Sequence, residues 1–348
     1  MTTDQPRRWK VAQWATGNIG SRSLRSVIEH PDLDLVGLYV HSPDKVGSDA
    51  GELCGTADTG VLATDDPDAI VAGDADCVLY MPQGCDVDQI CALLAAGKNV
   101  VTTRGEFHRP ASMDPDARRR VEAACTAGGA SIHSTGSSPG FITEAVPLVL
   151  ASIQRRLDFL AVDEFANLSR RDSPELLFSL MGFGRPPGEF DQRRADHFLH
   201  SFAPSLAVVG DAIGLPLDGF ESSGSLAVAA ARTEILAGVI EAGTVAGQRT
   251  TVTGTHGGRP LVQFRATWYC TTDLDPEWDV QPNGWHVSVQ GDTPLEVDLR
   301  FPVPLDQLAA TTPGYTAHRA VNAVPYVCAA DPGIRTSVDL PQIIPTLG

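Results

Sequence analysis

The residues from Lys10 to Gly20 have the types and spacing of a turn that binds the phosphates of a dinucleotide. A short apolar run ends at Trp14 and leads into six consecutive residues: Ala15, Thr16, Gly17, Asn18, Ile19 and Gly20. In such a strand–turn–helix segment, Gly17 lets a pyrophosphate approach the main chain, and Gly20 lets the next helix pack close to the strand. Ala15 stands where the first glycine of G-x-G-x-x-G is expected, so the pattern is incomplete. We nevertheless expect all six residues to contact a cofactor.

The end of the second expected strand indicates which nicotinamide nucleotide binds. An NAD site normally carries Asp or Glu about 20 residues beyond the glycine turn, on the ribose 2′-hydroxyl. Here the strand ends at His41 and Ser42, and Lys45 follows. Ser42 and Lys45 can bind a 2′-phosphate, and His41 can stack on adenine, contact the phosphate or simply lie in a surface loop. The sequence therefore favours NADP, with NAD as the less favoured cofactor.

Glu106 is the candidate catalytic residue. It follows the expected strand 99–103 by three residues, at the sheet edge where ligands of open parallel sheets bind. Simple amines are ammonium ions at neutral pH, yet only the free amine loses a hydride from its carbon or attacks a ketone. A carboxylate can hold the ammonium, take its proton and stabilise an iminium ion. We expect Glu106 to do this beside the nicotinamide, with Thr103 contacting the cofactor. Met81 and Pro82 either pack against the nicotinamide ribose or simply end their strand.

Other candidate residues lie farther along the chain. Pro139 and Phe141 occur at a domain crossover, where they form either a pocket wall or a plain hinge. Asn322, in a helical stretch, either binds the nicotinamide carboxamide or serves helix packing. Five arginines either clamp a substrate carboxylate or are surface charges: Arg170, Arg171, Arg185, Arg193 and Arg194. No His, Cys or Asp cluster has metal-ligand spacing, so we expect no metal.

The first 135 residues alternate between strand and helix. Expected strands are 10–14, 34–40, 76–81, 99–103 and 130–134, and expected helices are 21–30, 86–96 and 115–127. Several strands are continuous runs of Val, Leu, Ile and Ala, as in strands buried on both faces. Asp114 and Pro115 begin the third helix, and Gly128 and Gly129 end it. The pattern predicts an α/β, Rossmann-type, doubly wound parallel sheet.

The pattern changes after Gly140. Helices are expected over 142–153, 174–181 and 190–213, a strand over 157–168, and hairpins over 250–270 and 285–301. These elements predict an α+β domain with a mixed, mainly antiparallel sheet. A helix over 316–329 precedes a loop at 331–333. We expect a dinucleotide-binding domain formed by 1–140 and a returning segment 313–348, and a substrate-binding and dimerisation domain formed by 141–312.

The composition restricts the partners and the compartment. A net charge of −17 disfavours nucleic acid and anionic membrane surfaces. No apolar run approaches the ~20 residues needed to span a bilayer, and the N-terminus lacks the apolar core of a secretory signal. Seven cysteines without a C-x-x-C pair fit reduced thiols in a cytoplasmic protein. The three lysines, Lys10, Lys45 and Lys98, are the only ones available for chemistry.

Five segments together resemble one known group of enzymes. They are Gln13–Gly20, His41–Gly47, Val101–Glu106, Ser138–Phe141 and Val321–Pro325. These segments are similar to the dihydrodipicolinate-reductase-like dehydrogenases, and most to their 2,4-diaminopentanoate dehydrogenase and native amine dehydrogenase branch. The resemblance implies an NAD(P)-dependent enzyme that interconverts an amine with a ketone and ammonia through an imine, acts as a homodimer, and joins its C-terminal segment to the N-terminal domain.

Three alternatives remain open. A reductase of a cyclic imine such as dihydrodipicolinate lacks its expected lysine and histidine run, because no lysine follows Lys98. An alcohol or sugar dehydrogenase usually needs a Lys, Tyr or His acid and, in the sugar type, a Glu-Lys-Pro signature that is missing. A non-catalytic NADP-binding sensor would bind cofactor without turnover.

Overall fold

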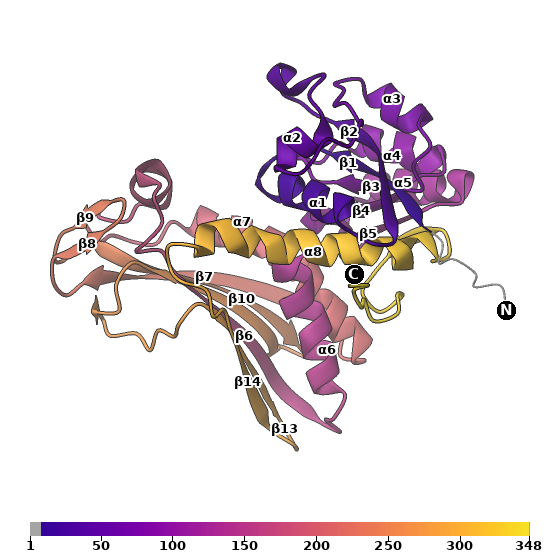
Figure 1. Ribbon diagram of the computed structural model, residues 1–348. Helices are drawn as coiled ribbons and strands as arrows, with labels where there is room; N and C mark the ends of the chain where they lie inside the picture. Colours follow the sequence, from indigo (N-terminus) through magenta and orange to yellow (C-terminus); the bar gives the residue numbers. More distant parts are fainter. Residues whose placement is uncertain (1–7, 348) are drawn as a thin grey trace. The chain divides into compact units, whose positions relative to one another are not determined.

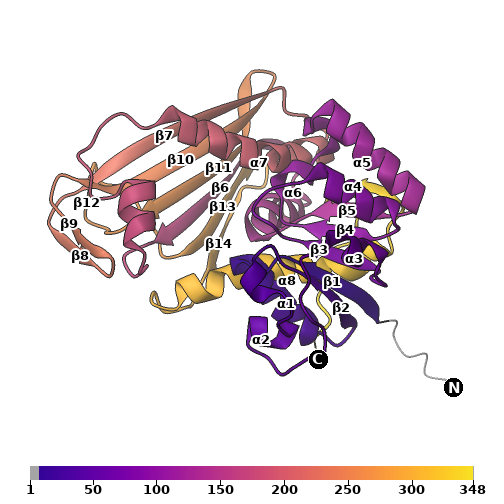
Figure 2. The same ribbon diagram turned by 90° about the horizontal axis from the view of Figure 1, so that it is seen from above.

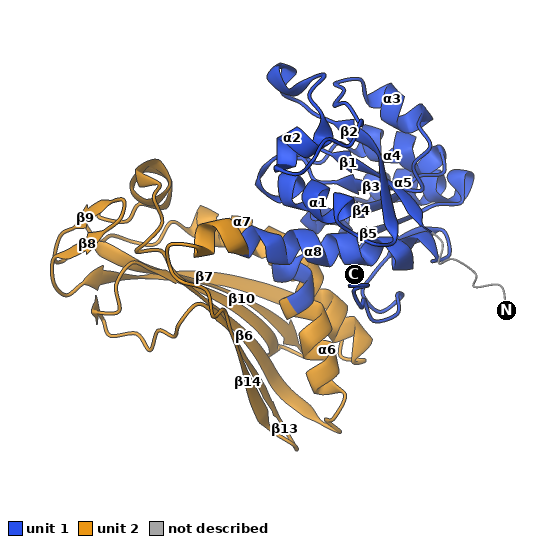
Figure 3. Cartoon of the chain, viewed as in Figure 1, with its two compact units in different colours: residues 1–141, 312–348 blue, residues 142–311 orange. Residues whose placement is uncertain are grey.

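The chain forms two compact units in a computed structural model that describes residues 8–347 (Figure 3). Unit 1 contains the described residues up to Phe141 together with those from Thr312 onward, and unit 2 is Ile142–Thr311. The expected fold class is confirmed, with a parallel sheet in unit 1 and a mixed sheet in unit 2. The N-terminal residues 1–7, from which we argued against a secretory signal, lie outside the described residues.

Unit 1 is built on six parallel strands in the order β15-β5-β4-β3-β1-β2 (Figure 1). Their bounds are β1 Trp9–Trp14, β2 Leu33–Tyr39, β3 Cys77–Tyr80, β4 Asn99–Thr102, β5 Ser131–Ser134 and β15 Gly333–Arg335. The order reverses at β1, which lies between β2 and β3. The carboxyl ends of β1, β3 and β4 therefore meet at one edge of the sheet, next to the glycine turn that follows β1.

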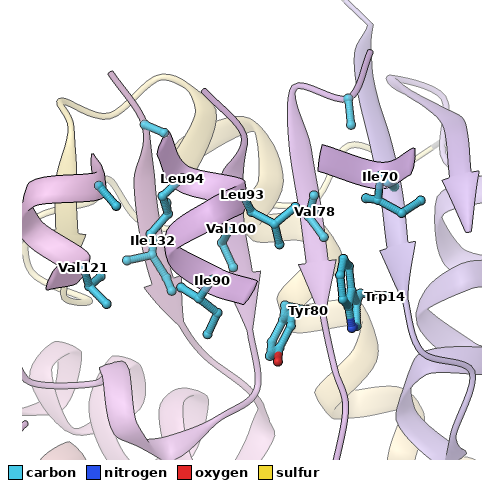
Figure 4. Packing of buried hydrophobic residues seen from close by; sticks show 14 of the residues in the cluster. Trp14, Ile70, Val78, Tyr80, Ile90, Leu93, Leu94, Val100, Val121 and Ile132 are labelled. Carbon is cyan, nitrogen blue, oxygen red and sulfur yellow. The ribbon is translucent and has the colours of Figure 1, made fainter. Parts of the chain in front are cut away.

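Helices cover both faces of this sheet. The unit 1 helices are α1 Asn18–Ile28, α2 Ala50–Cys54, α3 Pro67–Ala72, α4 Val87–Ala95, α5 Pro115–Gly128 and α8 Leu308–Cys328, the last of which begins in unit 2. Ile90, Leu93 and Leu94 of α4 pack with Val100 and other strand residues on one face (Figure 4). The α8 residues Val321, Val324 and Val327 pack with Val11 and Leu79 on the other.

Aspartates begin four of these helices. Asp86 accepts hydrogen bonds from the N–H groups of Asp88 and Gln89, and Asp114 accepts them from Asp116 and Ala117. Asp49 and Asp66 cap α2 and α3 in the same way. Each carboxylate satisfies N–H groups that the first turn leaves without an intrahelical partner. Gly129 ends α5 in the left-handed conformation, with φ 63°.

Unit 2 is a seven-stranded sheet in the order β12-β7-β10-β11-β6-β13-β14, with a separate β8–β9 pair. Its strands are β6 Leu157–Asn167, β7 Gly219–Ala229, β8 Thr233–Ile235, β9 Gly238–Ile240, β10 Val245–His256, β11 Arg259–Tyr269, β12 Leu274–Asp275, β13 Gly284–Gly291 and β14 Leu295–Arg300. Its helices include α6 Val146–Ala151 and α7 Gln192–Ala212. α7 lies over the sheet (Figure 2), where Phe198 and Phe202 stack on Phe264 of β11.

Several elements differ from the sequence expectations. α1 begins at Asn18 rather than at position 21, because the glycine turn leads directly into the helix. The expected helix 142–153 is less regular and shorter: residues 142–145 form wide turns after the non-helical Ser138, Pro139 and Gly140, and α6 follows to Ala151. Residues 331–333 are not only a loop, since β15 begins at Gly333. Single helical turns also occur at Pro43–Lys45, Gly105–Phe107 and Pro110–Ser112, and a wide-turned helix at Glu175–Met181.

Candidate cofactor and active site

The glycine turn follows β1 with a strained residue in its first position. Ala15 has a φ of 76°, the single positive value among the non-glycine residues that the structure describes. Its N–H donates to the Tyr39 carbonyl at 2.8 Å, and its own carbonyl accepts from the Gln13 amide at 3.0 Å. An L-residue in this conformation is disfavoured by contact of its Cβ with the main chain, and such strain is concentrated at functional sites.

Gly17 and Gly20 differ in the space around them. A Cβ added at Gly17 would meet no atom within 4 Å, so the main chain there is open to a ligand. A Cβ at Gly20 would overlap the Ala15 carbonyl oxygen and lie 2.9 Å from its carbon, so only glycine allows α1 this close to the turn. Gly17 precedes α1 without a side-chain cap, which leaves the helix N-terminus available to an anion.

Lys45 extends from the loop after β2 to the glycine turn. Its Nζ lies 3.1 Å from Thr16 Oγ1 and 3.3 Å from the Thr16 carbonyl oxygen, although the two residues are 29 positions apart in the chain. The side chain is half-buried. This contact places a positive charge beside the turn, at the end of β2, where a dinucleotide's adenosine ribose lies in this type of fold.

His41, Ser42 and Asn18 surround the same edge. His41 and Ser42 are exposed, and His41 Nδ1 lies 3.4 Å from the Tyr39 hydroxyl, with its ring against the edge of the Tyr39 ring. Asn18 accepts two hydrogen bonds of 2.7 Å from Arg22, through its carbonyl and its side-chain oxygen. Ile19 is half-buried and packs on the core under α8. No acidic residue stands at positions 40–42.

Glu106 lies on the single helical turn Gly105–Phe107 after β4. Its Oε1 forms a 2.8 Å salt bridge with Arg104, and its side chain is 43% exposed. Arg104 is itself held by the Gln83 carbonyl, which accepts from Nη1 at 2.6 Å. The turns after β3 and β4 are thereby joined at the carboxyl edge of the sheet. Glu106 Oε2 has no hydrogen-bond donor within residues 8–347.

Several side chains at or just after the ends of β3 and β4 are buried or half-buried. Burial, with the negative charge of Glu106 as a second cause, raises the pKa of the Cys85 thiol to about 11. Burial also raises the pKa of Tyr80 to about 12, and its hydroxyl donates to Gln89 Oε1 at 3.0 Å. Met81 is buried and packs on the α8 side of the sheet. Pro82 and Thr103 are half-buried beside the two strand ends.

The remaining expected contacts lie by α8. The Ser137 hydroxyl lies 2.7 Å from Thr316 Oγ1, and the Arg319 guanidinium lies 5.8 Å from the centre of the Phe141 ring. Pro139 is half-buried in the same segment. Asn322 is half-buried between the core residues Val321 and Ala323. The segment that contains Pro139 and Phe141 therefore packs against α8, the helix that also carries Asn322.

The arginines proposed for substrate are largely engaged elsewhere. Arg193 pairs with Asp191 and is 90% exposed, Arg194 donates to the carbonyls of Leu180 and Met181, and Arg185 donates to Ser179. For these three arginines the contacts favour the interpretation as surface charges; of the other two, Arg170 is exposed and Arg171 is half-buried. No group of three or more His, Cys, Asp or Glu side chains in residues 8–347 could hold a metal ion. No helix in that part of the chain has the length and hydropathy needed to cross a membrane.

Two residues of the site were not found by sequence reasoning. Gln13 lies within the strand and is fully buried, and nothing in its neighbourhood marks it as more than a strand residue. Arg104 stands two residues before Glu106, a spacing that joins side chains only because a tight turn separates them. The sequence did contain a signal for Arg104, because it is a positive charge close to the candidate catalytic acid Glu106.

Two family models match the chain. Residues 14–105 match the N-terminus of dihydrodipicolinate reductase, and residues 179–347 match the C-terminal domain of 2,4-diaminopentanoate dehydrogenase. Together these matches support the expected resemblance to the dihydrodipicolinate-reductase-like dehydrogenases, in the 2,4-diaminopentanoate and amine dehydrogenase branch. The chain is thus an oxidoreductase of an amine-acting group.

Individual relatives agree with this assignment. An amine dehydrogenase from Streptomyces virginiae is 29% identical over 358 residues, which cover 96% of each chain. The structure of an amine dehydrogenase from Mycobacterium smegmatis has a TM-score of 0.72 at 20% identity, with 97% of each chain covered. A scyllo-inositol dehydrogenase structure from Lactobacillus casei, with bound NAD(H), has a TM-score of 0.52 at 13% identity and covers 92% of this chain and 89% of its own. Both of these solved structures have the same fold as this chain.

Proposed function

We propose that this protein is an NADP-dependent amine dehydrogenase, which interconverts an amine with a ketone and ammonia through an imine. The observation that carries the proposal is the position of Glu106. It lies just past β4, on the sheet edge that also holds the glycine turn, in a chain of the amine dehydrogenase branch. The carboxylate supplies the charge and the proton acceptor that an ammonium substrate needs.

The residues of the turn fit a dinucleotide. Gly17 offers open main chain, α1 begins without a side-chain cap, and Gly20 keeps the helix against the strand. Lys45 beside Thr16, with no acid at the end of β2, supports a 2′-phosphate and hence NADP. The Lactobacillus casei dehydrogenase of the same fold holds NAD(H), so the preference for NADP rests on these residues and not on the fold.

Glu106 has two tasks in the proposed reaction. Its carboxylate holds the ammonium form of the substrate and takes a proton on Oε2, the oxygen that the Arg104 salt bridge leaves available. After Oε2 passes this proton to solvent, the carboxylate is negative again and stabilises the positively charged iminium ion that forms when the free amine loses a hydride. The bound nicotinamide supplies or accepts the hydride at the neighbouring carbon. Arg104 fixes the carboxylate in place through its second hydrogen bond, to Gln83.

Replacing Glu106 with Gln tests this role. The wild-type protein should oxidise NADPH only when a ketone and ammonia are both present, and a panel of ketones and keto acids would identify the substrate. Glu106→Gln should lower kcat by 10²-fold or more, as roughly expected for loss of a general base, and leave the NADPH Kd nearly unchanged.

Glu122→Gln is the matched control. Glu122 lies on α5, is also 43% exposed, and pairs with Arg118 at 2.7 Å, so the change in charge and ion pairing is the same. Its activity should be that of wild type. Comparable turnover by Glu106→Gln would remove Glu106 from the mechanism. NADPH binding without any ketone- and ammonia-dependent turnover would instead support the cofactor-sensor alternative.

The assembly and the compartment are also proposals. We propose a homodimer, on the family resemblance, and a cytoplasmic location, on the scattered cysteines. Light scattering of the purified chain tests the first. A mass near twice 36.9 kDa is expected.

A further inference from the structure

We propose that Gln13 is a positioning residue for the cofactor: its buried amide holds Ala15 in the left-handed conformation and so keeps the glycine turn open. This inference rests on the proposed function, because it concerns the same nucleotide site. Ala15 occupies the place where related turns have glycine, and its φ is 76°. Alanine does not adopt this conformation readily on its own, so other contacts must hold it there.

Both main-chain groups of Ala15 are fixed. The N–H is held by the Tyr39 carbonyl at 2.8 Å, which continues the pairing of β1 with β2. The carbonyl is held by Gln13 Nε2 at 3.0 Å, and the same amide lies 3.4 Å from the Trp14 carbonyl. Gln13 is 0% exposed, so water cannot replace these hydrogen bonds. Losing the donor would leave a buried carbonyl unsatisfied, which is costly.

The glutamine amide also occupies the space that Gly20 leaves. A Cβ at Gly20 would lie 3.3 Å from Gln13 Nε2 and would overlap the Ala15 carbonyl oxygen. Gln13, Ala15 and the start of α1 are therefore in contact at one point. If Ala15 left the left-handed conformation, its carbonyl would move, and the main chain of Thr16 and Gly17 would move with it. Those residues are the ones that face the cofactor's phosphates.

A double-variant experiment separates positioning from general stability. Gln13→Met keeps the length of the side chain and removes the donor. We expect it to weaken NADPH binding about tenfold, or about 1.4 kcal/mol. Glycine adopts the left-handed conformation without help. Ala15→Gly alone should therefore leave the Kd within about threefold of wild type, and Gln13→Met/Ala15→Gly should recover most of the lost affinity.

The readouts are the NADPH Kd from fluorescence titration without substrate, and the Tm without cofactor. Gln248→Met is the matched control, because Gln248 is 7% exposed and donates to the Met181 carbonyl in unit 2. It should lower the Tm and leave the Kd unchanged.

Three results would overturn the inference while the proposed cofactor stands: a wild-type Kd for Gln13→Met, a double variant as weak as Gln13→Met, or an equal loss of affinity in Gln248→Met. If Gln13→Met alone does not fold, Ala15→Gly is compared with the double variant. Equal affinities support the inference, and a tenfold gap overturns it. A wild-type protein that binds neither NADPH nor NADH overturns the proposed function and this inference together.

Discussion

Replacing Lys45 with Met should separate NADPH from NADH. Lys45 Nζ already lies 3.1 Å from Thr16 Oγ1, so a 2′-phosphate bound at the end of β2 would meet an ammonium that is in place. A hydrogen bond to a charged group contributes about 1.5–3 kcal/mol net, less than the Coulomb energy alone because the ammonium must give up its present partners and some solvent. The NADPH Kd should therefore rise roughly 10- to 150-fold.

NADH lacks the phosphate, so its Kd should change by less than about threefold. The assay is a fluorescence titration of each nucleotide at low and at moderate salt. The loss of NADPH affinity should shrink as salt is added, because screening weakens the interaction in the wild type as well.

Lys98→Met is the control for the loss of one positive charge. Lys98 is a half-buried lysine of the same unit, like Lys45, and its Nζ donates to the Gly73 carbonyl at 2.6 Å, away from the glycine turn. It should leave both Kd values unchanged. Equal losses for NADPH and NADH in Lys45→Met, or an equal loss in Lys98→Met, would refute the assignment of Lys45 to the 2′-phosphate.

Three further substitutions test the packing and the hydrogen bonds of unit 1. Gly20→Ala should abolish nucleotide binding and lower the Tm, because its Cβ would overlap main-chain atoms of Ala15; a normal Kd by titration would contradict the close approach. Leu93→Ala, at a fully buried position of α4, should cost about 3 kcal/mol in urea unfolding, and a loss below about 1 kcal/mol would contradict the packing. The N–H of Thr59, together with those of Gly51 and Gly60, holds the pKa of Asp49 below its ordinary value. That carboxylate therefore stabilises the fold above about pH 4 and loses its effect as pH falls further, so Asp49→Asn should lower the Tm at pH 7 and much less at pH 3; a constant difference would contradict this.

Local signals predicted much of unit 1. Asp114, Pro115 and Gly129 mark the ends of α5 because capping and the left-handed end depend on residue type at fixed positions. Gly20 could be interpreted correctly for the same reason, since only glycine permits the approach of α1. The short helices α2 and α3 were missed, although Asp49 and Asp66 cap them, because five or six residues are too few to show a helical period.

Long-range contacts were not predictable in this way. β11 pairs with β6 in parallel, within a domain whose hairpins indicate antiparallel pairs, and no local pattern encodes that neighbour. At the site, the position of Lys45 near the glycine turn could be expected from its place after β2. The left-handed Ala15 could not, because alanine rarely adopts that conformation and the amide that stabilises it belongs to the strand interior.

The short strand β15 has a consequence for how the protein is made. Gly333–Arg335 pairs with Ser131–His133 and covers the edge of β5, yet it is translated about 200 residues later. At 5–20 residues per second, roughly 10 to 40 s separate the emergence of the two strands from the ribosome. During that interval β5 presents open main-chain groups to other nascent chains. Messages truncated before residue 333 should therefore yield aggregated protein rather than a smaller nucleotide-binding fragment.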